Sequence, residues 1–160
     1  MSFRYLQLLF PVLVALHNAE EAIYIPRWAK PSGLWFGRVQ PAVFRFVVVM
    51  LTILALVITV LSTVEGRMTL WANLTFGSMM VTLFNALVPH IAVSVVKRTL
   101  MPGVVTAAVL NLPILSYLTV LALKQGYVSA HDAVVFSILA AFLLLLIIPL
   151  LFQLGKILVL

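Results

Sequence analysis

The sequence contains no cysteine, and only 9% of its 160 residues carry a charge. The absence of cysteine excludes disulfide bonds, thiolate metal ligands and cysteine nucleophiles. The scarcity of charge excludes a water-soluble globule, in which about 25% of residues are charged and about 45–50% are apolar. Here 64% of the residues are apolar, a content that also excludes a disordered chain. The sequence therefore predicts an integral membrane protein.

Acidic residues are especially scarce, with four Asp and Glu against ten Lys and Arg, which gives a formal net charge of +6. A basic chain can bind nucleic acid, but the interleaved aromatic and basic residues of a nucleic-acid module are missing. In a membrane protein the basic residues are explained by the positive-inside rule and by contact with anionic headgroups. We therefore expect membrane lipid, and not nucleic acid, as the partner.

Apolar residues occur in long blocks, and about 20 such residues cross the hydrocarbon core as a helix. The blocks are continuous and do not alternate with period two, which excludes a β-barrel. No linker or convincing internal repeat divides the chain. We predict one all-α domain, a polytopic transmembrane helix bundle that occupies residues 1–160. Its five spans are expected at 5–25, 42–64, 69–96, 101–123 and 132–154.

Prolines and short polar segments mark the ends and bends of these spans. Pro89 is expected to kink the third span, because proline cannot bond the carbonyl of Asn85 and leaves that oxygen free for a ligand or a polar neighbour. Pro102-Gly103 is expected to begin the fourth span, and His131-Asp132 to cap the fifth. The longest connection, Pro26–Gln40, is basic and aromatic, a composition typical of the headgroup layer.

The charges of the connections predict the orientation. The more basic side receives Arg27, Lys30, Arg38, Lys97, Arg98 and Lys156. The opposite side receives Arg4, Arg67 and Lys124, together with Glu65 and Asp132. The positive-inside rule counts Lys and Arg and makes the first side cytoplasmic. We expect the N-terminus outside and the C-terminus in the cytoplasm, with the protein in the plasma (inner) membrane of a prokaryote.

Two of the four acidic residues, Glu20 and Glu21, fall inside the first predicted span together with His17. A carboxylate at mid-membrane costs about 2.5–3.5 kcal/mol on the insertion scale, and two adjacent ones cost about twice that. On a helix, the two glutamates lie three and four residues after His17, so all three side chains can face one neighbour. An imidazole with carboxylates one turn away is typical of metal ligation in helical bundles.

Polar residues of other spans are expected at a similar depth, measured from the more basic connections at about 1.5 Å per residue. By this measure Glu21 lies about 6 Å and His90 about 10 Å deep, and Asn111 and Asn85 lie about 14 Å and 18 Å deep. Three spans therefore bring their most polar groups into the same half of the bilayer. The two asparagines are interpreted either as substrate-binding groups or as hydrogen-bond partners that pin helices together.

His17, His90 and one glutamate, assigned as Glu21, form a two-histidine, one-carboxylate set. Such a set suits Zn²⁺ or Fe²⁺ and leaves coordination positions open for water or substrate. Glu20 can then act as a general base or hold a ligating histidine in its tautomer. Without a metal, a glutamate beside His17 can shuttle protons, as an isomerase for an apolar lipid requires. We predict a divalent metal cofactor, Zn or Fe, and Glu20 and Glu21 as catalytic residues.

Two arginines are expected at the mouth of this site, Arg27 in the segment PRW and Arg98 in the segment RTLMPG. Arginine binds phosphate through paired hydrogen bonds, so both can hold a lipid headgroup while the tail lies among the helices. The alternative interpretation is that both are ordinary residues of the positive-inside topology.

Three segments together resemble a known family. They are the pentapeptide HNAEE (His17–Glu21), the segment NALVPH that ends at His90, and RTLMPG followed by Asn111 and Pro113. Over its first four spans the chain is similar to the HXXEE-motif membrane proteins, small polytopic proteins largely without assigned activity. The resemblance implies that His17, Glu20 and Glu21 are the defining residues of the family, and it implies no reaction.

The leading functional prediction is a metal-dependent membrane enzyme, a hydrolase or an isomerase, that acts on a lipid or another apolar substrate such as a prenyl-type molecule. The first alternative is a small transporter or carrier that binds a cation or a proton with Glu20 and Glu21. Transporters usually contain two repeats, which five spans provide only if a homodimer supplies the symmetry. A second alternative is an assembly partner without chemistry, for which the glutamate pair is dispensable.

Overall fold

The structure is a computed structural model that describes residues 2–32 and 40–159, with the backbone alone for residues 26–32. Within these residues all regular structure is helical, as predicted. The elements are α1 (Phe3–Leu6), α2 (Leu9–Ser32), α3 (Pro41–Glu65), α4 (Leu70–Asn85), the π-helical turn η2 (Ala86–Ile91), α5 (Ala92–Lys97), α6 (Val104–Thr106), the π-helical turn η3 (Ala107–Asn111), α7 (Leu112–Lys124) and α8 (Ala130–Val159).

Five helical units of the described chain are long and apolar enough to cross a membrane. They are Phe3–Ile25, Pro41–Glu65, Leu70–Lys97, Val104–Lys124 and Ala130–Val159. The predicted number of long apolar helices is confirmed, and the bounds of the helices differ from the predicted spans at their ends. The connection predicted to begin at Pro26 is shorter, because α2 continues to Ser32. The fourth unit begins at Val104, directly after Gly103, whose φ of 87° ends the preceding connection.

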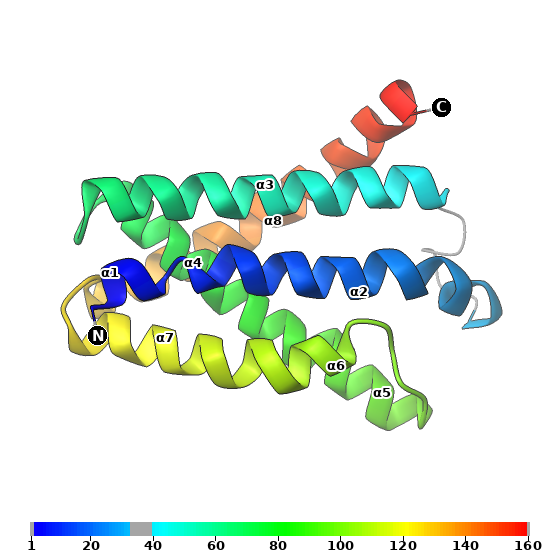
Figure 1. Cartoon of the computed structure of the whole chain (residues 1–160), viewed down its shortest axis with the longest axis horizontal. Coiled ribbons are helices and arrows are strands. Elements are labelled where there is room, and N and C mark those ends of the chain that lie inside the picture. Colours follow the sequence, from blue (N-terminus) through cyan, green and yellow to red (C-terminus); the bar gives the residue numbers. More distant parts are fainter. Residues whose placement is uncertain (1, 33–39, 160) are drawn as a thin grey trace.

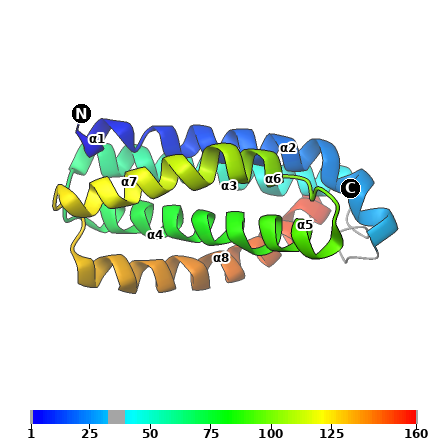
Figure 2. The same cartoon turned by 90° about the horizontal axis from the view of Figure 1, so that it is seen from below.

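Successive units run in opposite directions, so the connections gather at the two ends of the bundle (Figure 2). One end holds the N-terminus with the α3–α4 and α7–α8 connections, and the other holds the α5–α6 connection and the C-terminus. Lys97, Arg98 and Lys156 therefore lie toward one end, in the grouping that the sequence predicts. The side chains of Arg27 and Lys30, and the whole of Arg38, lie outside the described part of the chain.

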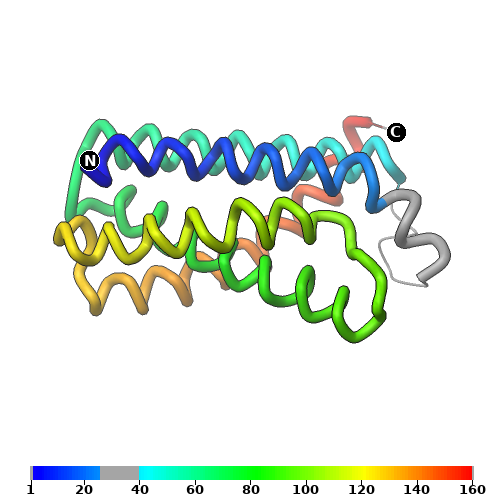
Figure 3. The backbone as a smooth tube through the Cα atoms, turned by 60° about the horizontal axis from the view of Figure 1, so that its bottom comes forward, coloured from blue at the N-terminus to red at the C-terminus, as the bar shows by residue number. Residues whose placement is uncertain are grey.

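Helices α4 and α8 cross in close contact at Gly77. A Cβ atom at this position would collide with the backbone carbonyl of Phe136 and lie 3.1 Å from the Cβ of Ala140. Small residues allow such close approach of helices within a membrane. From this crossing the two helices diverge toward the end of the bundle that carries α5 and the C-terminus (Figures 1 and 3). The divergence opens the space into which the functional residues project.

The third unit is kinked at the predicted position. Val88, inside η2 and directly before Pro89, has the non-helical angles φ −134° and ψ 113°. The second π-helical turn, η3, packs against η2. Irregular backbone at membrane depth is tolerated where it is buried in protein or lines a cavity, and π-helical turns are frequent at functional sites. The kink predicted from Pro89 is confirmed, whereas η3 has no proline within it and was not predicted.

The start of α8 differs in detail from the predicted cap. The hydroxyl of Ser129 accepts the backbone N–H of Asp132 at 3.0 Å and donates to its carboxylate at 2.8 Å. Asp132 therefore takes part in the cap with Ser129, while the side chain of His131 is exposed.

A buried polar network joins the first two units to the α7–α8 connection near the N-terminal end of the bundle. The amide nitrogen of Gln7 donates to the hydroxyl of Tyr127 at 2.9 Å and to that of Thr63 at 3.1 Å. The amide oxygen of Gln7 accepts from the hydroxyl of Ser62 at 2.8 Å, and Tyr127 donates to the carbonyl of Ser62 at 2.7 Å. Because its polar atoms satisfy one another, this network serves packing.

Replacement of Gln7 by alanine is expected to lower the free energy of unfolding by about 1–3 kcal/mol, because it leaves buried hydroxyl groups without a partner. Thermal unfolding of the purified protein in detergent, followed by circular dichroism, measures the change. The exposed Gln153 provides the matched control, and Gln153→Ala is expected to unfold at the same temperature as the wild type. Equal stability of Gln7→Ala and the wild type would show that the network contributes little to the fold.

Candidate metal centre

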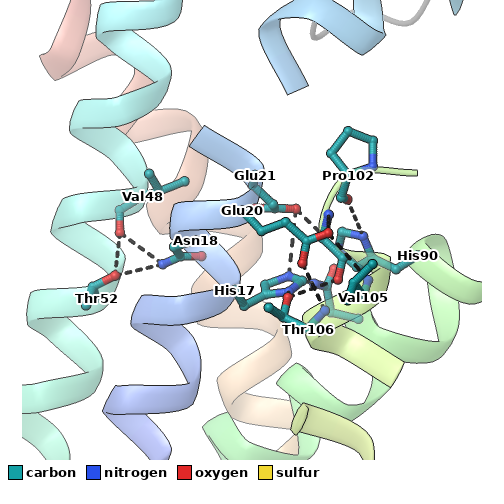
Figure 4. Close-up of polar contacts among 12 residues, drawn as sticks. His17, Asn18, Glu20, Glu21, Val48, Thr52, His90, Pro102, Val105 and Thr106 are labelled. Atoms are coloured by element: carbon teal, nitrogen blue, oxygen red, sulfur yellow. Dashed lines mark hydrogen bonds and ion pairs between the residues drawn. The ribbon is translucent and has the colours of Figure 1, made fainter. Parts of the chain in front are cut away.

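Three side chains from α2 and η2 converge on one point inside the bundle (Figure 4). Nε2 of His90 lies 3.2 Å, and Nε2 of His17 lies 3.8 Å, from Oε1 of Glu21. One potential ligand atom from each residue lies within 4.8 Å of the others. The side chains of His17 and His90 are 5% and 1% exposed, and that of Glu21 is 16% exposed. The structure thus brings together the three residues that were predicted as metal ligands.

The Nδ1 atoms of both histidines face hydrogen-bond acceptors of the segment Pro102–Thr106, at the start of the fourth unit. Nδ1 of His90 lies 2.9 Å from the carbonyl oxygen of Pro102, which can only accept, so this nitrogen carries a proton. Nδ1 of His17 lies 3.0 Å from the hydroxyl of Thr106, which itself donates to the carbonyl of Gly103 at 3.2 Å. The hydroxyl therefore accepts from His17. When neither ring carries a second proton, the two Nε2 atoms present their lone pairs toward Glu21.

A carboxylate oxygen that faces two nitrogen lone pairs requires a cation between them, either a metal ion or a proton. Zinc binds nitrogen and oxygen at about 2.0–2.2 Å, so two ligand atoms of a tetrahedral site lie about 3.3 Å apart. The separations of 3.2 Å and 3.8 Å between Glu21 and the histidines are close to this value. The donor set fits Zn²⁺ or Fe²⁺ with a small inward movement of the imidazoles.

Gly103 allows the backbone of the α5–α6 connection to pack over both imidazoles. A Cβ atom on Gly103 would lie 2.7 Å from Cε1 of His90 and 2.8 Å from Cε1 of His17. The residue also has a φ of 87°, a conformation that side chains disfavour. The two rings themselves pack edge to face, with centroids 4.6 Å apart. Glycine is therefore required here for two independent reasons, whereas the sequence predicted only that Pro102-Gly103 begins a helix.

Glu20 binds the backbone at the start of the fourth unit. Its two carboxylate oxygens accept the N–H groups of Gly103 and Thr106, each at 2.9 Å, and Oε1 also lies 3.4 Å from the N–H of Val105. The first N–H groups of a helix lack partners within the helix, and a carboxylate satisfies them with favourable charge. Glu20 thereby positions the segment that orients both histidines. It is not one of the three convergent ligand residues.

Asn18, which lies inside the motif, connects α2 to α3. Its amide nitrogen donates to the carbonyl of Val48 at 3.0 Å and to the hydroxyl of Thr52 at 2.8 Å (Figure 4). The motif helix is therefore held on one face by α3 and on another by the fourth unit.

The remaining predicted site residues lie in different surroundings. Asn85 faces the cluster, with Nδ2 3.5 Å from Nε2 of His17. Asn111 is buried in η3, and neither polar atom of its side chain has a hydrogen-bond partner within the described part of the chain. Arg98 follows α5 with a φ of 50° and is exposed, and the side chain of Arg27 lies outside the described residues. Headgroup binding by the two arginines stays a prediction.

The cluster opens into a cavity of about 650 Å³ between α2, α3, the α4–η2 unit and α8. Its polar wall consists of His17, Asn18, Glu21, Asn85 and His90, with Ser78 and Thr82 further along α4. Most of the remaining wall is apolar and includes Phe10, Val14, Leu51, Ile58, Phe84, Val88, Leu144, Leu145, Ile148 and Phe152. The volume lies within the range of about 300–1,000 Å³ that is typical of small-molecule sites.

Five apolar helical units around a buried His–Glu–His cluster define a small polytopic membrane protein with a candidate metal centre. Residues 8–118 match the family described as "Protein of unknown function with HXXEE motif", and the chain belongs to this family. The uncharacterized protein YrkK of Bacillus subtilis (strain 168) is 31% identical over 149 residues, which cover 91% of this chain and 92% of YrkK. No solved structure matches the chain. The resemblance inferred from the motif is confirmed.

Replacement of Glu20 by glutamine is expected to weaken metal binding by about 10–100-fold without abolishing it. The amide keeps one acceptor oxygen but turns an NH₂ group toward a backbone N–H, which loosens the segment that orients the histidines. Titration of the purified protein with Zn²⁺ against a competing chelator measures the affinity. The exposed Glu65 provides the control, and Glu65→Gln is expected to bind as the wild type does. Wild-type affinity in Glu20→Gln would contradict the positioning role.

Proposed function

We propose that the protein is a metal-dependent membrane enzyme that acts on a lipid or another apolar substrate. The observation that carries this proposal is the position of a two-histidine, one-carboxylate donor set on the wall of a largely apolar cavity. Ionisable residues within a membrane span are costly and mark functional sites by default. An apolar cavity with a few convergent polar groups is the usual form of a small-molecule site.

In this proposal each polar residue of the centre has a distinct role. His17 and His90 would hold the ion through Nε2 and Glu21 through Oε1, which leaves one coordination position open. A bound Zn²⁺ or Fe²⁺ supplies Lewis acidity toward an oxygen of water or substrate. The second carboxylate oxygen of Glu21 can hold or pass a proton, and Glu20 acts through the segment that it positions. Hydrolysis and isomerisation are both compatible with these roles.

The carrier alternative requires a route on which a cation stays solvated or coordinated. Away from the cluster, the described wall of the cavity is apolar toward Phe10 and Ile58, apart from the hydroxyls of Ser78 and Thr82 on α4. A cation in such surroundings would lose its hydration without compensation. The lining therefore favours an apolar molecule as the occupant and supports the enzyme over the carrier.

Purified protein that is loaded with Zn²⁺ and then freed of excess ion is expected to retain about one ion per chain, measured by elemental analysis. Glu21→Gln and His90→Ala each remove one donor atom and are expected to lower the retained metal by at least about ten-fold. Glu65→Gln and His131→Ala are matched controls at exposed positions and should retain it. Full metal content in both Glu21→Gln and His90→Ala would contradict the proposed centre.

The catalytic part of the proposal is tested on the same samples. Metal-loaded protein in micelles is incubated with a total lipid extract, and the lipids are compared by mass spectrometry before and after. A lipid that is consumed by the wild type, and left intact by Glu21→Gln or after chelation, supports an enzyme. Uptake of a cation into proteoliposomes that depends on Glu21, without any change in the lipids, would favour the carrier instead.

A further inference from the structure

The cavity is elongated along the helices. On α2 its wall extends from Phe10 to Ile25, a distance of about 22 Å at 1.5 Å per residue. The metal-binding residues occupy an intermediate position on this wall. From His17 the apolar part of the wall continues for about 10 Å to Phe10. A molecule that fills this space is therefore long and narrow, with its polar group beside the cluster and hydrocarbon beyond it.

Both ends of the described cavity are lined by buried apolar side chains. At the end nearest the α2–α3 connection, Ile25, Phe44 and Val48 form a buried cluster against which Phe152 packs. At the opposite end, the wall residues Phe10, Ala55 and Ile58 belong to the main hydrophobic core. A molecule at either end of the described cavity therefore meets apolar side chains.

Helices α4 and α8 diverge beyond their crossing at Gly77 (Figure 1), and residues of α4–η2 and α8 beyond this crossing form one side of the cavity wall. Three wall residues on these two elements have highly exposed side chains, namely Phe84 at 65%, Val88 at 48% and Leu145 at 72%. Phe84 and Leu145 lie near the middle of their spans, Leu70–Lys97 and Ala130–Val159. This side of the cavity therefore faces the hydrocarbon core of the membrane, where only apolar molecules or apolar parts of lipids are found.

The charge of the wall limits the class of molecule further. Phosphate groups are usually bound by Arg or Lys. The described wall contains neither, and its ionisable residues are His17, Glu21 and His90. Arg98 is exposed on the α5–α6 connection and is not part of the wall. A charged phospholipid headgroup drawn into this cavity would lose its hydration without gaining a cationic partner other than the metal.

We propose that the cavity takes an uncharged lipid with one long hydrocarbon chain and an oxygen-bearing end, such as a long-chain alcohol, which enters sideways between η2 and α8. The chain lies along α2 toward Phe10, and the oxygen-bearing end lies at the His17–Glu21–His90 cluster. The identity of the reacting end rests on the proposed metal centre, whereas the opening and the chain site rest on the walls of the cavity alone.

Photolabelling of protein in lipid nanodiscs tests this inference. The probe is a long-chain alcohol with a diazirine about 10 Å along its chain from the hydroxyl, the distance from His17 to Phe10 along α2. Its counterpart is a phosphatidic acid with the same labelled chain. The alcohol is expected to label wall residues near Phe10, such as Val14 and Ile58, and excess unlabelled alcohol should suppress the label. The phosphatidic acid probe is expected to give no specific label near Phe10, so excess unlabelled phosphatidic acid should change nothing there.

Two tryptophan variants examine the opening. Leu145→Trp fills it and is expected to reduce the label near Phe10 by about ten-fold. Leu146→Trp places the same side chain at the next residue of α8, which is exposed but outside the wall, and is expected to leave the label unchanged. Val88→Trp blocks the opposite side of the opening. If Leu145→Trp does not fold, the label near Phe10 is measured in Val88→Trp, where the same reduction is expected.

The inference is overturned by any of three results with the wild type or the folded variants. In the first, excess unlabelled alcohol does not suppress the label from the alcohol probe. In the second, phosphatidic acid labels the same residues equally well and its unlabelled form suppresses that label. In the third, the label near Phe10 is not reduced when tryptophan fills the opening. Retained Zn²⁺ is measured on the same samples. A full metal content without the cavity label refutes the lipid site alone, and a suppressible label without retained metal refutes the proposed metal centre alone.

Discussion

The hydrogen bonds that the Glu20 carboxylate accepts from the start of the fourth helical unit are the interaction on which the site depends. They hold Gly103 and Thr106 against α2. Thr106 fixes the Nδ1 proton of His17, and the neighbouring carbonyl of Pro102 fixes that of His90. The fourth unit begins here, and its first N–H groups have no partner within the helix, so an acidic side chain beside them has a structural role. One anionic contact thereby orients two imidazoles.

The spacing of the motif follows from this arrangement. His17 and Glu21 are one helical turn apart and share a face of α2, which directs both at His90. Glu20 is rotated by about 100° from its neighbour and therefore faces the fourth unit. Two adjacent acids are costly in a membrane, and here each has its own partners. Glu20 contacts backbone N–H groups, and Glu21 contacts the two imidazoles. The candidate centre thus combines a carboxylate that positions the backbone, Glu20, with a carboxylate that is a candidate metal ligand, Glu21.

The sequence was sufficient to predict the five spans, the kink at Pro89 and the convergence of His17, Glu21 and His90, because hydropathy, proline geometry and depth along a helix are local properties. Depth alone was insufficient for Asn111, which is buried in η3 but is not part of the cavity wall. The roles of Glu20 and Gly103 depend on a contact between segments more than 80 residues apart. The cavity was equally inaccessible to sequence reasoning, because its α3 and α8 walls are ordinary apolar residues.

A metal ion held by two imidazoles and one carboxylate is the central claim, and X-ray absorption spectroscopy of the Zn²⁺-loaded protein tests it most directly. The spectrum is expected to contain two imidazole nitrogens at about 2.0–2.1 Å and a carboxylate oxygen at about 2.0–2.2 Å. Because the chain has no cysteine, no thiolate ligand can contribute. A spectrum with no imidazole, or with oxygen ligands alone, would contradict the assignment of His17, Glu21 and His90 as the metal centre.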